Sequence, residues 1–506
     1  MRKEPLSSQL KGDGFTRLVH QTLDKWHVPG MAIAVIDGDD TWSEGYGYAN
    51  IVSSTPVTPS TLFYAGSTTK AFTAAMIAKL TEDPTRDIEW GTPITQLLPD
   101  GFSLIDKSVA DQITVEDALS HRTGLPGHDH ASAHTNVREN VRRLAHLPMT
   151  AKPRTRYQYN NLMYVAVSHI IEIATGQWLG DSLARSFWLP LGMKNTYFSL
   201  DNALRGPATL AQGYYYLGWR SESQDEKAYR EVDWMPLEEV SGAGSVITNV
   251  LDYTKWVRAF LRPQTFVEEK IFKSEETVRQ LWEPRTLMPS DEPFIGPRAY
   301  CLGWRTGVYQ GVQFFEHTGG MNAFGAQLLL VPKLQFSVII LANTSQTSNF
   351  AAQLLAFHLL DERLGVPKSQ RFDWNQRNWS VIEKEQKRVA DKINYRPPIY
   401  IQPTLALGQY VGTYTNAGYK DLTVYLDNGG VLRADRKDMT WPEAIEFRHV
   451  TGEHFLMVSE HHEDYGAFCP DVYEAEFRIN VEGKVWTLGV AWERAMEGKK
   501  IWLQRT

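Results

Sequence analysis

The sequence has little cysteine: only Cys301 and Cys469 occur among its 506 residues, far apart in the chain. Two isolated thiols supply neither a disulfide framework nor the spacing of a metal site, so we expect no bound metal and no cofactor. The chain also lacks a run of basic residues, and its formal net charge is −7. This charge balance argues against a nucleic-acid partner.

Long apolar runs are absent too. No stretch is long enough to cross a bilayer, so we expect no membrane span. No apolar segment follows residues 1–5, which predicts that there is no signal peptide and that the protein is soluble and cytoplasmic. What is present is the composition of a globular protein, 42% apolar and 22% charged, in a chain long enough for two or three structural units.

Residues 64–72, with the sequence YAGSTTKAF, hold the pattern on which the functional interpretation depends. Ser67 and Lys70 stand three positions apart, where the apolar residues that follow predict a buried helix. Residues at this spacing share a helix face, so the amine could take the proton that a serine loses when it acts as a nucleophile. Burial and the helix dipole would lower the pKa of that amine. The alternative is a capping serine with a solvated lysine, since Ser8 and Lys11 have the same spacing without an apolar helix.

Strand patterns bracket a helical middle. Apolar runs of strand length are predicted at 31–36, 41–49, 312–315, 326–331 and 336–342. Helical spacing predicts helices at 15–26, 161–174 and 350–364, within a chain that is mostly helices and loops from 85 to 205. Residues 206–240 are aromatic and charged, and we expect a surface loop there. The arrangement predicts an α/β (α+β) fold, with one antiparallel sheet flanked by helices and an all-helical subdomain.

The last part of the chain has a different pattern. Residues 366–400 are polar, with a charged helical piece at 383–392, and we interpret them as a linker. Beyond them, apolar residues alternate with period two, as at 422–426, which predicts a small β-barrel or sandwich. We therefore expect a first domain at 1–365 and a small C-terminal β-barrel at 401–506.

Two further motifs could meet Ser67. Tyr159 and Asn161 stand at the start of an apolar helix in the helical middle. The run His317-Thr318-Gly319-Gly320 follows the strand at 312–315, and its glycines would let backbone come close to a bound substrate.

Each of these motifs has a competitor elsewhere in the sequence. Tyrosine two positions before asparagine also occurs at Tyr48 and Tyr414, where we expect structural roles. Arg305-Thr306-Gly307 is similar to the third motif, but it comes before the strand and not at its active-site end, so we do not take it as the third motif.

Taken together, the motifs resemble those of the serine β-lactamase and penicillin-binding protein superfamily. The closest resemblance is to its class C β-lactamase-like branch, with DD-carboxypeptidases, D-aminopeptidases and related esterases, where the second motif is Tyr-x-Asn and the third may be His-Thr-Gly. The resemblance covers residues 10–365 and implies a catalytic domain of the β-lactamase/transpeptidase type. Residues 409–414 give the tail a looser resemblance to the lipocalin-like domain of some members.

The resemblance implies a role for each motif residue. Ser67 would attack a carbonyl carbon and form an acyl-enzyme, while Lys70 and Tyr159 would share the acid and base work. Backbone N–H groups of Ser67 and Gly320 would form the oxyanion hole. Asn161 would bind a substrate amide and orient Lys70. The residues expected to bind substrate are Asn161, His317, Thr318, Gly319 and Gly320.

His317 stands where β-lactamases have a lysine, so a permanent cation is missing at pH 7. This favours an ester, amide or peptide bond in a small molecule or peptide over a β-lactam, and predicts that activity on anionic substrates rises as the pH falls. The alternatives left open are an acyltransferase or transesterase in natural-product biosynthesis, a true β-lactamase and a non-catalytic scaffold. The sequence does not predict the oligomeric state.

Overall fold

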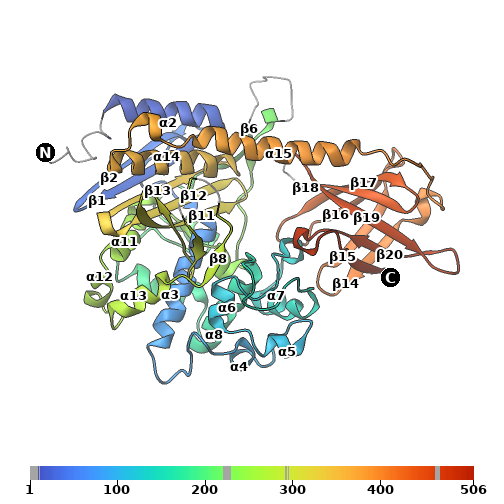
Figure 1. Ribbon diagram of the computed structural model, residues 1–506, viewed down its shortest axis with the longest axis horizontal. Helices are drawn as coiled ribbons and strands as arrows, with labels where there is room; N and C mark the ends of the chain where they lie inside the picture. The colour runs from blue at the N-terminus through green and yellow to red at the C-terminus, as the bar shows by residue number, and fades with distance from the viewer. Residues whose placement is uncertain (1–9, 11, 220–228, 291–292, 295, 462–467) are drawn as a thin grey trace.

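The structure is a computed structural model that describes residue 10 and residues 12–219, 229–290, 293–294, 296–461 and 468–506. Two parts lie side by side: a sheet with helices on both faces, and a closed β-barrel (Figure 1). Within the described residues, no helix combines the length and the apolar character that crossing a membrane requires.

Nine antiparallel strands form the large sheet, in the order β3-β2-β1-β13-β12-β11-β10-β9-β8. Their bounds are Gly30–Asp37 (β1), Asp40–Asn50 (β2), Thr55–Pro56 (β3), Thr286–Met288 (β8), Arg298–Tyr300 (β9), Arg305–Tyr309 (β10), Val312–Met321 (β11), Phe324–Val331 (β12) and Phe336–Ala342 (β13). The early and late strands join where β1 pairs with β13. The predicted antiparallel sheet is confirmed, but β11 runs on through His317 to Met321, so the third motif lies inside the strand.

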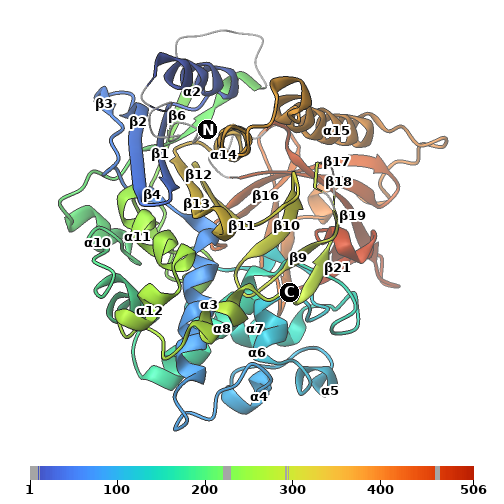
Figure 2. The ribbon, with the colours of Figure 1, turned by 60° about the vertical axis from the view of Figure 1, so that its left-hand side comes forward.

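The sheet is covered on both faces because successive side chains of its central strands point to opposite sides. On β1, Ile33 and Val35 pack with α2 and α14, whereas Ala32 and Ala34 belong to the core shared with α3 and α11. These helices span Asp13–Trp26 (α2), Thr347–Leu364 (α14), Thr69–Thr81 (α3) and Val250–Leu261 (α11). Figure 2 shows α2 and α14 on one side of the sheet and α3 and α11 on the other. This cover on both faces explains why β12 and β13 are buried along their whole length.

The middle of the chain is mostly helical, as predicted. Its remaining helices are Ile94–Leu97 (α4), Lys107–Ala110 (α5), Val115–Leu119 (α6), Val137–Arg143 (α7), Asn161–Thr175 (α8), Leu179–Leu183 (α9), Leu200–Arg205 (α10), Gln264–Glu268 (α12) and Glu275–Trp282 (α13). The prediction of a surface loop at 206–240 is partly wrong. Within it β5 (Gly213–Tyr216) pairs with β6 (Tyr229–Val232), and Tyr214 is buried. Residues 220–228 lie outside the described residues.

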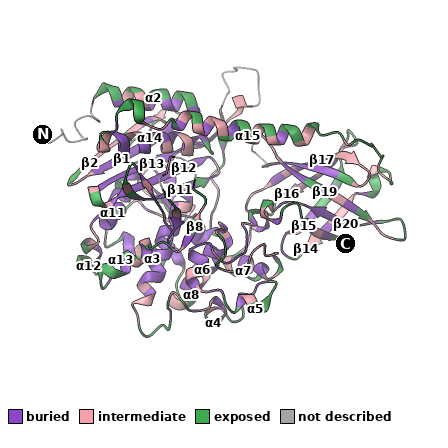
Figure 3. Ribbon diagram, in the orientation of Figure 1, coloured by how far each residue is buried: buried purple, intermediate pink, exposed green. Residues whose placement is uncertain are grey.

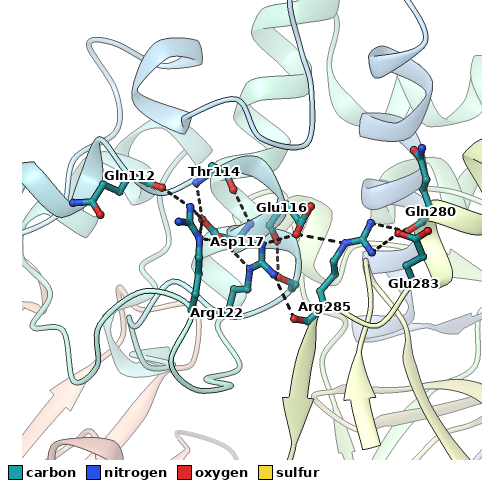
Figure 4. A network of polar contacts seen from close by, with 10 residues as sticks. Gln112, Thr114, Glu116, Asp117, Arg122, Gln280, Glu283 and Arg285 are labelled. Carbon is teal, nitrogen blue, oxygen red and sulfur yellow. Dashed lines mark hydrogen bonds and ion pairs between the residues drawn. The ribbon is translucent and has the colours of Figure 1, made fainter.

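A polar network holds the loop that follows α6 (Figure 4). The fully buried carboxylate of Asp117 accepts the backbone N–H of Thr114 and forms ion pairs with Arg122 and Arg154, at 2.6 and 2.7 Å. Burial would raise the pKa of Asp117, but these hydrogen bonds and charges lower it overall, so the carboxylate stays ionised. The network therefore fixes the start of the loop that holds His121, whose ring packs against Tyr159 and Tyr300.

The C-terminal part is a closed barrel whose strands follow one another in chain order, the up-and-down arrangement found in lipocalins. Its strands are Gly412–Asn416 (β14), Lys420–Leu426 (β15), Leu432–Arg436 (β16), Glu443–Thr451 (β17), His454–His461 (β18), Asp471–Ile479 (β19), Val485–Val490 (β20) and Ile501–Arg505 (β21). This confirms the predicted barrel. The charged helical piece expected at 383–392 is part of a longer helix, α15 (Trp374–Asn394). Most of its residues are exposed or half-buried, whereas α3 is mostly buried (Figure 3).

Candidate active site

Ser67 lies in a short 3₁₀ turn, η1 (Gly66–Thr68), that leads into α3. Gly66 has a φ of +51°, in the left-handed region that glycine adopts without strain. A Cβ on Gly66 would lie 2.8 Å from the backbone nitrogen of Gly320, and a Cβ on Gly319 would lie 2.0 Å from the carbonyl oxygen of Ala65. Gly66 and Gly319 therefore let η1 lie directly against the end of β11, which brings Ser67 to the third motif.

Lys70 is fully buried beneath Ser67. Its Nζ lies 3.1 Å from Ser67 Oγ, 2.7 Å from Asn161 Oδ1 and 2.8 Å from the carbonyl oxygen of Ala243. Burial lowers the pKa of Lys70 well below its ordinary value, and the charge of Arg305 lowers it further, against an opposing effect of Asp129.

These three contacts fit an uncharged amine. The oxygens of Asn161 and Ala243 are carbonyl acceptors, so each takes one N–H of Lys70. A neutral amine has two N–H groups and one lone pair, and the lone pair is then left for Ser67 Oγ. The arrangement can accept the hydroxyl proton of Ser67.

Tyr159 lies two residues before the start of α8, beside Ser67 and Lys70. Its ring centroid is 4.9 Å from Lys70 Nζ. Burial raises the pKa of Tyr159 well above its ordinary value, although the charge of Arg305 and a hydrogen bond with Ser67 oppose the shift. The phenol therefore keeps its proton at neutral pH, next to the serine that Lys70 contacts.

Asn161, the first residue of α8, connects Lys70 to an acid that the sequence did not single out. Its Oδ1 accepts from Lys70, and its Nδ2 donates to Asp129 Oδ1 at 3.0 Å. Asp129 is exposed and lies in η2 (Asp129–Ala131). No motif marks Asp129, because it reaches the site only through the path of its loop.

His317 lies deep in the group and does not face solvent. Its Nδ1 lies 2.7 Å from the carbonyl oxygen of Thr318, which can only accept, so Nδ1 carries the hydrogen and Nε2 accepts from the hydroxyl of Tyr300 at 2.9 Å. Burial lowers the pKa of His317 well below its ordinary value, and the charges of Arg305 and Lys70 lower it further. Both ring nitrogens are occupied, and the imidazole is neutral.

Arg305 supplies the permanent cation that His317 does not. Arg305 lies opposite Glu316 in the pairing of β10 with β11. The carboxylate of Glu316 forms an ion pair with Arg298 and not with Arg305. Arg305 Nη1 donates to Thr318 Oγ1 at 3.2 Å, and the guanidinium carbon lies 6.0 Å from the ring centroid of Tyr159. The run Arg305-Thr306-Gly307 is a different segment from the third motif, but Arg305 lies beside that motif because β10 pairs with β11.

The loop at residues 126–134, called here the docked loop, carries Asp129 and is held by the barrel. His128 Nδ1 accepts from the hydroxyl of Tyr419 at 2.6 Å, since its Nε2 donates to the carbonyl oxygen of Pro148. His130 Nδ1 lies 3.1 Å from a carboxylate oxygen of Glu443. The barrel thus contacts the residues on both sides of Asp129.

The competing motifs do not reach this group. Tyr48 lies on β2 and is half exposed, and Tyr414 is buried in the barrel, where its hydroxyl donates to the carbonyl oxygen of Tyr410. Ser8 and Lys11 lie outside the described residues. The structure therefore brings together Ser67, Lys70, Tyr159, Asn161 and the third motif, and adds Arg305 and Asp129.

Comparison with known families and relatives gives a consistent result. The model of the Beta-lactamase family matches residues 15–362, and that of a domain of unknown function (DUF3471) matches residues 397–505. The unguisins hydrolase ungD' of Aspergillus campestris is 41% identical to this chain, over 97% of this chain and 91% of the relative. The unguisins hydrolase ungD of Aspergillus violaceofuscus is 39% identical, over 99% and 91%.

Solved structures share the fold at lower identity. An octameric penicillin-binding protein homologue from Pyrococcus abyssi superposes with a TM-score of 0.61 at 20% identity, over 97% of this chain and 99% of that one. A D-amino acid amidase from Ochrobactrum anthropi SV3 gives 0.56 at 21% identity, over 71% and 100%.

Proposed function

The chain belongs to the Beta-lactamase family, and from this premise we propose that it is a serine hydrolase that cleaves an amide or ester bond through an acyl-enzyme at Ser67. The observation that carries the proposal is the environment of Lys70. Its Nζ lies 3.1 Å from Ser67 Oγ and contacts two carbonyl oxygens, and burial lowers its pKa. In its uncharged form the amine would donate to the two carbonyl oxygens and keep its lone pair for the proton of Ser67.

In the acylation step, Ser67 Oγ attacks the carbonyl carbon while Lys70 takes the hydroxyl proton. The charge that develops on the carbonyl oxygen is stabilised by the backbone N–H groups of Ser67 and Gly320. Tyr159 donates its proton to the leaving nitrogen or oxygen and regains one from Lys70, which restores both groups. In the second step a water molecule attacks the acyl carbon while Lys70 and Tyr159 take its proton. The bond between the acyl carbon and Ser67 Oγ then breaks, the proton returns to Ser67 Oγ, and the acid leaves.

We infer that the substrate is an unguisin or a close analogue of one, because two relatives that match almost the whole chain are named unguisins hydrolases. The guanidinium of Arg305 and the hydroxyl of Thr318 would bind an oxygen of the substrate beside the reacting carbonyl. The neutral His317 offers no positive charge to an anionic substrate, but Arg305 supplies a permanent one. An anionic group on the substrate is therefore compatible with the site.

The test is incubation of the full-length protein with an unguisin, followed by mass spectrometry. We expect a product heavier than the substrate by one water molecule, or two fragments that together contain one added water. Ser67→Ala should give neither, and the exposed Ser53→Ala should behave as the native protein. Acyl transfer would instead appear as a product joined to an added amine, and no conversion of unguisins with rapid cephalosporin hydrolysis would replace the proposal with a β-lactamase.

A further inference from the structure

A cavity of about 450 Å³ opens at the end of β11, between the sheet and the barrel. Its wall begins at Gly320 and Met321, continues along α15 at Ile382, and includes Trp441 of the barrel. Segments that are far apart in sequence therefore build one space. Its volume lies within the range of small-molecule sites, about 300–1,000 Å³.

The wall combines apolar side chains with polar ones such as Asn322, Gln346 and Asn349. The apolar side chains that line it are Met321, Phe350, Val381, Ile382, Trp441 and Phe468. Such a lining favours an apolar or aromatic group over a charged one, because a charge placed there would lose its hydration.

The charged residues of the wall compensate one another. Arg494 forms ion pairs with Glu385 at 2.9 Å and with Asp471 at 3.5 Å. Among the described residues of the wall, the single arginine is matched by two carboxylates, so these residues present no uncompensated cation to a substrate anion. The anchor for an anion is Arg305, which is not part of this wall.

The cavity adjoins the point where the reaction would occur. Gly320 belongs to its wall, and the same residue lies against η1 next to Ser67. Asn349 fixes this end of β11, because its Nδ2 donates to the carbonyl oxygen of Gly319 at 2.7 Å. A substrate carbonyl held by the backbone N–H of Gly320 therefore has the cavity immediately beside it.

We propose that this cavity is a substrate subsite, which takes a bulky apolar or aromatic side chain carried on the acyl group that Ser67 attacks. The proposal rests on the proposed function, because it uses Gly320 as the oxyanion-binding residue. It also gives the barrel a role in specificity. Trp441 is held towards the catalytic domain by the docked loop, where the N–H of Thr440 donates to the carbonyl oxygen of Ser132 at 3.1 Å.

The experiment uses two N-acetyl aminoalkylphosphonate diphenyl esters that differ only at the side chain, hydrogen in one and benzyl in the other. Ser67 Oγ forms a bond to phosphorus and phenol leaves, so the second-order rate of modification needs no known substrate. The native protein should react with the benzyl compound, in one configuration, about 10-fold faster than with the other. Trp441→Ala should reduce this preference to about 2-fold or less and leave the rate of the small compound almost unchanged.

Two further variants distinguish a change in the cavity from a general effect of substitution on folding. Val381 lines the cavity from the exposed side of α15, so Val381→Trp should fill the space and reduce the same preference. Trp486 is half exposed on β20 and does not line the cavity, so Trp486→Ala should change neither rate. Modification of Ser67 without any benzyl preference, or with a preference that Trp441→Ala and Val381→Trp leave intact, would overturn the subsite alone. No modification of Ser67 by either compound would overturn the proposed function as well.

Discussion

At the scale of the residue, burial sets the two protonation states that the proposed chemistry needs. Lys70 and Tyr159 lie in one desolvated group, and loss of hydration disfavours the charged form of each. The pKa of Lys70 is therefore lowered and that of Tyr159 is raised, so the amine is free to accept a proton and the phenol keeps one to donate. Neither group needs a metal or a carboxylate to reach its working state.

Tyr159→Phe should lower the rate of acylation by about 100-fold or more, the usual scale for losing a general acid or base. The ring stays in place, so the melting temperature should change little. The measurement is pre-steady-state release of p-nitrophenol from a p-nitrophenyl ester, with Tyr48→Phe as the control on the exposed face of β2. Acylation at the native rate would remove Tyr159 from the mechanism.

Arg305→Gln should discriminate between substrates by charge. Loss of a charge-assisted hydrogen bond should lower kcat/KM for a carboxylate-bearing ester by about 10-fold or more and affect a neutral ester much less. The measurement compares the two esters with the native protein and the variant. An equal loss on both would show that Arg305 acts through the fold and not through the substrate.

The pH dependence expected from the sequence changes with the structure. A histidine near the reference pKa of about 6.5 would gain charge as the pH falls towards 6 and assist anionic substrates. Because burial and nearby cations lower the pKa of His317 well below that value, it remains neutral over this range. The ratio of anionic to neutral ester turnover should therefore stay constant from about pH 8 to pH 6. A ratio that rises as the pH falls, and does so only while His317 is present, would contradict this.

At the scale of the element, the docked loop links the catalytic domain to the barrel. His130 and Glu443 form an ion pair, and Arg436 pairs with the other oxygen of the same carboxylate at 2.9 Å. Burial would lower the pKa of His130, but the charge of Glu443 raises it overall. Burial would raise the pKa of Glu443, but His130 and Arg436 lower it. The loop that carries Asp129 is thus fastened by a charged contact inside the barrel.

This contact predicts a pH-dependent stability. A group whose pKa is raised on folding stabilises the fold below its unfolded pKa, and that contribution is lost as the pH rises through the folded pKa. His130→Gln should therefore lower the melting temperature more at about pH 6 than at about pH 9, while Glu443 stays ionised at both. The exposed His146→Gln is the control. Equal losses at the two pH values would show that His130 contributes packing and not charge.

Elements with a clear period could be predicted from the sequence, and contacts between them could not. The alternation around Val424 marks a strand with one buried face, and the run from Phe336 to Ala342 marks a fully buried strand. Arg305 reaches Thr318 because β10 and β11 pair in one register. Asp129 reaches Asn161 from a loop that contacts the barrel. Sequence patterns indicate which residues belong to the same helix or strand. Arg305 and Asp129 instead contact residues of other elements, which such patterns do not predict.

At the scale of the whole molecule, we propose that the boundary near 365–400 separates a catalytic domain from a barrel that completes its site. A fragment of residues 1–397 should melt cooperatively, because the sheet and its helices form most of their own core. Its rate on a small ester should fall by about 100-fold, since the docked loop loses Tyr419 and Glu443 and no longer positions Asp129. An insoluble fragment would place the two parts in one folding unit, and native turnover would show that the barrel does not support catalysis.

The central claim is that Ser67 is the nucleophile of a covalent mechanism. The most direct measurement is intact-mass detection of the protein after reaction with a small fluorophosphonate, with peptide mapping of the modified residue. The account predicts a single adduct on Ser67 and none in Ser67→Ala, with slower labelling when Lys70 is replaced by methionine. An adduct on any other residue, or labelling of Ser67→Ala at the native rate, would contradict it.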